Sequence, residues 1–138
     1  QLKGIDINIA EKETKGTPLH FACRRKMADI VKVLLTFDNV NVNAKAAYDT
    51  YPIHSACRSN NFDVVKLLLD RDDININDCK TKPPHKNQEM SPIQSAAKHG
   101  HAMIVKMLIA HPMCDINCKN FVFLFIYFFN FVFLLFCF

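Results

Sequence analysis

The sequence of 138 residues contains no tryptophan, only three glycines and no charged residue after Lys119. The scarcity of glycine, with only six prolines, excludes a collagen-like chain and Pro/Gly-rich disorder. The net charge of +4 is too small to predict binding to a nucleic-acid backbone by charge alone. No N-terminal apolar run is present, so no signal peptide is visible in this sequence.

The missing charge near the C-terminus divides the chain into two parts. All charged residues lie within 1–120, whereas 121–138 holds nine of the twelve phenylalanines and has Asn130 as its one clearly polar side chain. We therefore expect a folded domain over 1–120 and a separate hydrophobic, Phe-rich tail over 121–138.

The first part repeats itself every 34 to 40 residues. One motif occurs three times, as GTPLHFAC from Gly16, TYPIHSAC from Thr50 and MSPIQSAA from Met90, and an apolar run follows each copy. Segments ending in asparagine recur at the same period, at Asn8, Asn43, Asn77 and Asn117. This periodicity predicts stacked repeats, with a partial unit over 1–12 and full units over about 13–46, 47–86 and 87–120.

The first motif reads T-P-L-H-F-A from Thr17 to Ala22 and resembles the T-P-L-H-x-A signature of the ankyrin repeat family. The later copies are more degenerate, and the resemblance covers residues 5–120. It implies an all-α ankyrin-repeat solenoid of stacked helix–turn–helix units with β-turn fingers between them. It also implies a non-catalytic scaffold or adaptor that binds another protein through the concave face formed by the first helices and the fingers.

Residues around the prolines predict where the first helices begin. Thr17 before Pro18 and Ser91 before Pro92 each place a capping hydroxyl ahead of a proline at the first helical position. Gln94 stands at the position that completes a capping box.

The second unit and the turns between helices depart from this pattern. Tyr51 precedes Pro52 and lacks a suitably placed hydroxyl, so that helix start should be weaker by about 1 kcal/mol. The turn after the first helix favours a left-handed residue, which Gly100 supplies and Asn60 tolerates, but Lys26 does not. The first unit is therefore expected to be strained there or to turn differently.

Six histidines raise the question of catalysis or metal binding. The resemblance implies that His20 and His54, at the fourth position of the signature, make hydrogen bonds within the scaffold. His101 occupies the common Gly-His position after a first helix. We expect the remaining histidines to be surface residues, namely His85, His99 and His111.

The cysteines indicate neither disulfides nor a metal site. Cys23 and Cys57 occupy equivalent positions in adjacent units, about 8–10 Å apart if their helices pack, which is too far for a disulfide. Unpaired cysteines fit a cytoplasmic or nuclear location. Cys114 and Cys118 with His111 form at most half of a zinc site, so we expect no metal, no cofactor and no enzyme activity.

Exposed positions of the first helices are candidate protein-binding residues. Arg24, Arg58 and Lys98 occupy the same place in successive units, which predicts a row of cations for an acidic partner. A role in solubility alone remains the alternative. The other candidates are Arg25, Ser59 and His99 in a second row, Phe21, Ser55 and Ser95 in a third, and Lys80, Lys82 and Lys86 in a long basic finger over 79–88. Nucleic acid is disfavoured, because only Phe21 offers a stacking ring.

Three interpretations of the tail remain open. As a helix, its 18 residues would span about 27 Å and form a membrane anchor after Lys119, which would keep the repeats in the cytosol. A T-rich non-coding stretch translated by mistake would read similarly, and a buried docking segment is the third interpretation. The alternatives for the whole chain are the cytoplasmic ankyrin portion of a membrane-anchored or channel-like protein, or the regulatory arm of a larger enzyme.

Overall fold

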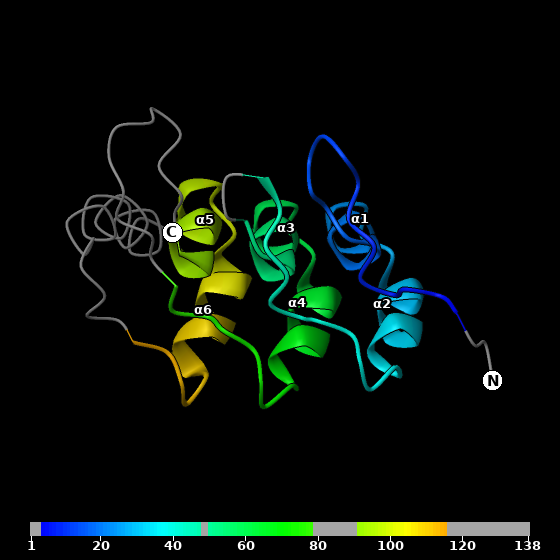
Figure 1. Ribbon diagram of the computed structural model, residues 1–138. Coiled ribbons are helices and arrows are strands. Elements are labelled where there is room, and N and C mark those ends of the chain that lie inside the picture. Colours follow the sequence, from blue (N-terminus) through cyan, green and yellow to red (C-terminus); the bar gives the residue numbers. More distant parts are fainter. Residues whose placement is uncertain (1–3, 48–49, 79–90, 116–138) are drawn as a thin grey trace, which may run out of the picture.

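The computed structural model describes residues 4–47, 50–78 and 91–115, which form six α-helices in three pairs. The pairs are α1 (Pro18–Arg24) with α2 (Ala28–Leu35), α3 (Pro52–Arg58) with α4 (Phe62–Leu69), and α5 (Pro92–Lys98) with α6 (Ala102–Ala110). They stand side by side in a row (Figure 1). The prediction of an all-α solenoid of helix–turn–helix units is confirmed.

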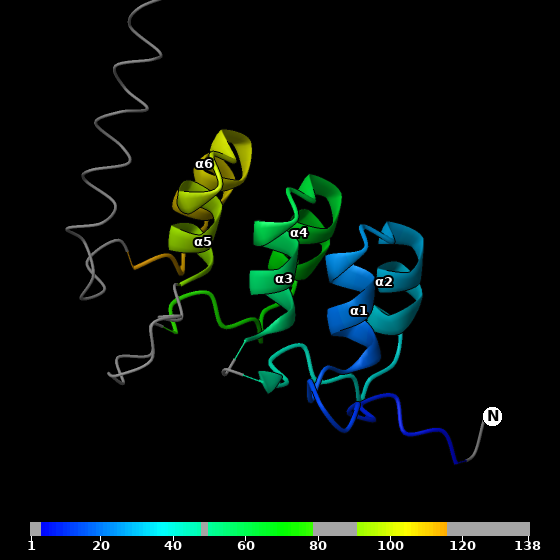
Figure 2. The same cartoon turned by 90° about the horizontal axis from the view of Figure 1, so that it is seen from above.

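The helices form two parallel layers (Figure 2). One layer contains α1, α3 and α5, and the other contains α2, α4 and α6, with each helix packed on its neighbours within the layer. Helices of seven to nine residues are too short to be stable alone in water. Their stability therefore comes from stacking, as expected for a repeat array.

The core lies between the two layers and is most complete around the second pair. Ile53 on α3 and Val64, Val65 and Leu68 on α4 are fully buried, because a helix pair covers each side of this pair. Deleting such side chains typically costs about 2–5 kcal/mol. The second pair is therefore the most sensitive part of the stack to core substitution.

Each helix of the first layer begins with a proline at its first or second position. At α5 the Gln94 amide N–H donates to Ser91 Oγ (3.3 Å), and the Ser91 amide N–H donates to Gln94 Oε1 (3.0 Å). At α1, His20 takes the glutamine's place: its Nδ1 accepts from the Thr17 amide (3.2 Å) and lies 2.9 Å from Thr17 Oγ1. A reciprocal cap thus forms with two different side chains.

The start of α3 is built around the Tyr51 ring. Tyr51 is buried, its hydroxyl donates to the Asp78 carboxylate, and its ring stacks on His54 with 5.5 Å between centroids. The Tyr51 amide N–H donates to His54 Nδ1 (3.3 Å), so His54 acts at α3 as His20 does at α1. The Tyr51 hydroxyl thus bonds to Asp78 in the next finger, whereas the Thr17 hydroxyl bonds to His20 of its own helix.

The turns between the two helices of each pair have the same backbone conformation. Lys26, Asn60 and Gly100 have φ values of +61°, +53° and +74°. Of the two alternatives left open for the first unit, strain is therefore the one observed, because Lys26 adopts the left-handed conformation that a side chain disfavours.

Several sequence predictions lie outside the described residues. These are the basic finger with Lys80, Lys82 and Lys86, the residues His85 and Cys118, and the tail over 121–138. None of the helices within 4–47, 50–78 and 91–115 has the length and hydrophobicity of a membrane span. The unit boundaries proposed from the sequence stay predictions.

Candidate protein-binding surface

The buried side chain of His20 joins the first unit to the second. His20 Nε2 lies 3.0 Å from the Thr50 carbonyl oxygen, and because Nδ1 accepts from the Thr17 amide, Nε2 carries the proton and donates. Burial lowers the pKa of His20, an effect that the bond to Thr50 partly opposes. The neutral imidazole is thus a hydrogen-bonding bridge between units.

Two further histidines make similar bridges from the third unit. His101 Nε2 donates to the Arg58 carbonyl (3.1 Å) and His111 Nε2 donates to the Leu69 carbonyl (3.2 Å). His111 is half-buried, so it is less exposed than the surface position expected from the sequence. His99 is exposed as expected and stacks on His101 with 5.9 Å between ring centroids.

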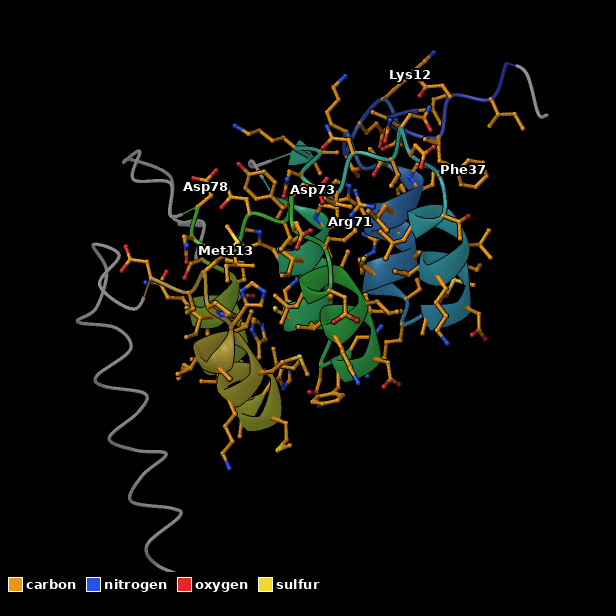
Figure 3. The ribbon with its side chains drawn as sticks, turned by 90° about the horizontal axis from the view of Figure 1, so that it is seen from below. Lys12, Phe37, Arg71, Asp73, Asp78 and Met113 are labelled. Atoms are coloured by element: carbon orange, nitrogen blue, oxygen red, sulfur yellow. The ribbon has the colours of Figure 1, made fainter. Side chains whose placement is uncertain are left out.

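Three of the asparagines that recur with the repeat period join successive fingers: Asn8, Asn43 and Asn77. Their periodicity alone did not reveal this role. Asn43 Nδ2 donates to the Asp73 carbonyl (2.6 Å), and Asn43 Oδ1 accepts from the Asn75 amide (2.8 Å). Asn8 and Asn77 make the same pair of bonds to the following segments. We call these three residues the asparagine ladder; it runs along the edge where Asp73 and Met113 lie (Figure 3).

Three exposed cations mark the last turns of α1, α3 and α5, and we call them the cationic row: Arg24, Arg58 and Lys98. In the described part of the chain, no carboxylate lies within ion-pair distance of any of them. The Arg24 guanidinium lies over the Phe21 ring, 5.0 Å from its centroid, a cation–π contact that orients the arginine without neutralising it.

The other predicted contact residues differ in how much surface they offer. Arg25 is exposed, whereas Ser59 and Phe21 are half-buried. Ser55 and Ser95 are buried, so they present little surface to a partner. Among the described residues, the most accessible part of the predicted surface is therefore the cationic row with Arg25 and His99.

Exposed apolar side chains beside the cationic row had not been predicted. Met27, Phe62 and Met103 lie at the starts of the second helices, a few residues after the row's cations, and all three are exposed. They occupy different positions within their units, so the repeat pattern contains no signal for them. We call Met27, Phe62 and Met103 the apolar edge. Exposed apolar side chains near cations are typical of protein-binding surfaces.

The cysteines and histidines of the described ranges do not gather as metal ligands. Within 4–47, 50–78 and 91–115, no three His, Cys, Asp or Glu side chains gather as metal ligands would. Cys23 and Cys57 are buried free thiols. Burial raises the pKa of Cys23 to about 12 and that of Cys57 further, so neither is a ready nucleophile.

Comparison with known protein families agrees with the geometry. One family model, described as ankyrin repeats in three copies, matches residues 1–78, and another, described as ankyrin repeats in many copies, matches residues 53–109. A search of curated proteins finds no match. Since the first model spans more than half of the chain, and the signature motif and the first two helix pairs lie within it, the chain belongs to the ankyrin repeat family.

Proposed function

We propose that this chain is a protein-binding module whose partner presents an acidic surface to the cationic row. Ankyrin repeats are in general protein–protein interaction modules, and the surface residues of each array choose its partner. The observation that carries the acidic partner is the recurrence of an exposed cation, without a carboxylate in ion-pair distance, at one position of three successive described units.

Two other described cations, Arg71 and Lys32, do have acidic neighbours. Arg71 Nε lies 2.9 Å from Asp73 Oδ1, and Lys32 Nζ lies 3.8 Å from Asp29 Oδ1. Charge-assisted bonds to a partner's carboxylates would give the cationic row the neutralisation that Arg71 finds within the chain.

A structural role for the row is the alternative. Each cation lies in the last turn of a helix, where the helix dipole favours positive charge by about 0.3–1 kcal/mol. Such a role requires no partner. Binding and stability must therefore be measured on the same variants.

The apolar edge sharpens the expected partner. Met27, Phe62 and Met103 supply exposed apolar area next to the cations. A partner with apolar side chains among its carboxylates would gain affinity from the apolar side chains, and the carboxylates would orient it on the surface. We therefore expect an acidic segment that also carries apolar residues.

Charge reversal tests this function. The row variant carries Arg24→Glu, Arg58→Glu and Lys98→Glu. The matched control carries Glu at three exposed lysines of the second helices, Lys32, Lys66 and Lys106. Both variants change the net charge equally, and both are compared with the parent chain in capture of partners from a native extract, with identification by mass spectrometry.

We expect the row variant to lose acidic partners that the parent and the control retain. Capture by the parent should also weaken as salt rises from about 0.1 M to 1 M, as the Debye length falls from about 10 Å to 3 Å. A partner set unchanged by the row variant would contradict the proposal. Equal thermal stability of the two variants would show that lost capture is not caused by unfolding.

A cytoplasmic or nuclear location is a second part of the proposal. It is supported by the free thiols of Cys23, Cys57 and Cys114, since unpaired cysteines are typical of reducing compartments. If the tail is translated and inserted, the repeats would face the cytosol. An alkaline carbonate wash of cell membranes tests the anchor, and release of the chain into the soluble fraction would count against it.

A further inference from the structure

The third helix pair exposes positions that the earlier pairs bury. Val31 on α2 and Val65 on α4 are both 0% exposed, whereas Val105, at the same position on α6, is half-buried. One turn farther along these helices, Leu69 on α4 is 9% exposed and Ile109 on α6 is 41% exposed. Among the described residues, the face of α6 that carries Val105 and Ile109 is therefore open.

The neighbouring helix α5 shows the same contrast. Cys23 on α1 and Cys57 on α3 are 0% exposed, whereas Ala97, at the same position on α5, is half-buried. No described helix pair precedes Cys23, so its cover comes from the pair that follows, through the contact of α1 with α3. At the other end of the row, α5 and α6 form the last described pair (Figure 1). We call the surface formed by three residues of this pair the outer face: Ala97, Val105 and Ile109.

The hydrophobic tail over 121–138 is tethered close to the outer face. The Asp115 amide donates to Asn77 Oδ1 (2.8 Å), a bond of the asparagine ladder that holds Asp115 beside the preceding finger. Residues 116–120 separate Asp115 from the tail and can span about 20 Å when fully extended. Ile109 lies at the end of α6 that leads to Asp115, and Val105 lies about 6 Å before it along the helix. The start of the tail can therefore reach both residues.

The composition of the tail matches the chemistry of the outer face. The tail holds no charged residue, and nine of its 18 residues are phenylalanine. Packing these rings on Val105 and Ile109 would remove apolar surface of both partners from water, which is the main force that favours docking. No copy of the repeat motif occurs in 121–138, so such a contact is not a further step of the ankyrin stack.

We propose that the tail over 121–138 docks on the outer face of the same molecule. The short tether favours this occupant over a second copy of the chain, because a short linker gives an effective concentration in the millimolar range. Asn130 favours it over insertion into a membrane. It is the tenth of the 18 tail residues, so in a spanning helix its amide would lie near the centre of the bilayer, where no water is available to it.

Alkylation of an introduced cysteine in the full chain tests whether the outer face is covered. Ile109→Cys reports on the face, with the modified peptide identified by mass spectrometry. Ile30→Cys is the matched control, because Ile30 is also an isoleucine of a second helix, is 44% exposed where Ile109 is 41% exposed, and lies on α2 at the opposite end of the row (Figure 1). We expect Ile109→Cys to react about tenfold more slowly than Ile30→Cys, or slower still, because a covered site must open before it reacts. Equal rates would overturn the proposal.

Photo-crosslinking identifies what covers the face. A benzophenone side chain replaces Ile109, or Ile30 in the control chain, and unlabelled chains are mixed with isotope-labelled chains before irradiation. We expect crosslinks from position 109, and none from position 30, to peptides of 121–138, with each crosslink joining two peptides of the same isotope composition. Crosslinks between labelled and unlabelled peptides would assign the face to a second copy. That result, or the absence of crosslinks from position 109 to the tail, would overturn the proposal.

Phosphatidylcholine vesicles distinguish docking from membrane insertion. When the vesicles are added, the crosslink from position 109 to the tail should persist, and the chain should not float with the vesicles in a density gradient. Flotation of the chain together with loss of the crosslink would assign the tail to a bilayer and overturn the proposal.

Discussion

Replacing Lys26 with glycine should stabilise the protein, although Lys26 is an exposed residue. Its φ of +61° lies in the left-handed region, which costs a residue with a side chain about 1–2 kcal/mol. Glycine removes that cost but loses about 0.4–1 kcal/mol through the greater freedom of the unfolded chain. The net gain should be about 0.5–1 kcal/mol, or roughly 4 °C in Tm for a domain of this size.

Arg25→Gly is the matched control. Arg25 is the adjacent residue, it is also exposed and positively charged, and its φ is −93°, so glycine relieves no strain there. We expect this variant to lose about 0.4–1 kcal/mol by the entropy cost alone. Urea and thermal unfolding, followed by circular dichroism, compare both variants with the parent chain.

The converse change at the third turn completes the series. Gly100 has a φ of +74°, and a Cβ added there would meet no atom within 4 Å. Gly100→Ala should therefore destabilise by about 0.5–1 kcal/mol through backbone strain without any clash. If Lys26→Gly and Arg25→Gly lowered stability equally, strain at the first turn would be refuted.

Three other substitutions or titrations test the connections between units and within the finger. Asn43→Ala removes two inter-finger bonds and should cost about 1–2 kcal/mol in urea unfolding, whereas Asn39→Ala removes an exposed side chain without such bonds and should cost under about 0.5 kcal/mol. Burial lowers the pKa of His20, so below about pH 6.5 the unfolded chain binds a proton that the folded chain does not. The free energy of unfolding should therefore fall from pH 7 to pH 5, and His20→Asn should flatten that slope. Hydrogen bonds from Glu13 and Thr14 lower the pKa of Glu11 to about 2. The Glu11 carboxylate therefore favours the folded state above about pH 4.3, and this preference is lost as pH falls toward 2. An NMR titration midpoint of Glu11 near the ordinary glutamate value would disprove these hydrogen bonds.

Features that depend on neighbours in sequence were predictable. The prolines at the starts of α1, α3 and α5 and the Ser91–Gln94 pair act over three residues, so the motif itself contains the information. Gly100 likewise marked a left-handed turn, and its φ of +74° agrees. Three copies of one pattern then led to the stacked arrangement, because no short helix pair can bury its apolar face alone.

Features that depend on stacking were not predictable to the same degree. The partner of His111 is the Leu69 carbonyl, 42 residues away, and that distance is closed only once α6 lies on α4. The sequence did not decide the backbone conformation at Lys26. The motif shows the energetic cost of a left-handed lysine, but it does not show the packing energy gained by keeping α1 and α2 in register. Met27, Phe62 and Met103 have no common position, so nothing in the repeat pattern marked their exposure.

The contrast between Ile30 and Val64 shows where the limit lies. The period identifies the two residues as equivalent, and both are β-branched and apolar, so local rules assign them the same role. Their exposures of 44% and 0% differ only because α4 has a described helix pair before it and α2 does not. Equivalence within a repeat therefore predicts which face a residue points to, and the neighbouring unit decides whether that face is core or surface. Binding in such an array is expected at positions where equivalent residues differ in chemistry or in cover, and the exposed Met27, Phe62 and Met103 are of this kind.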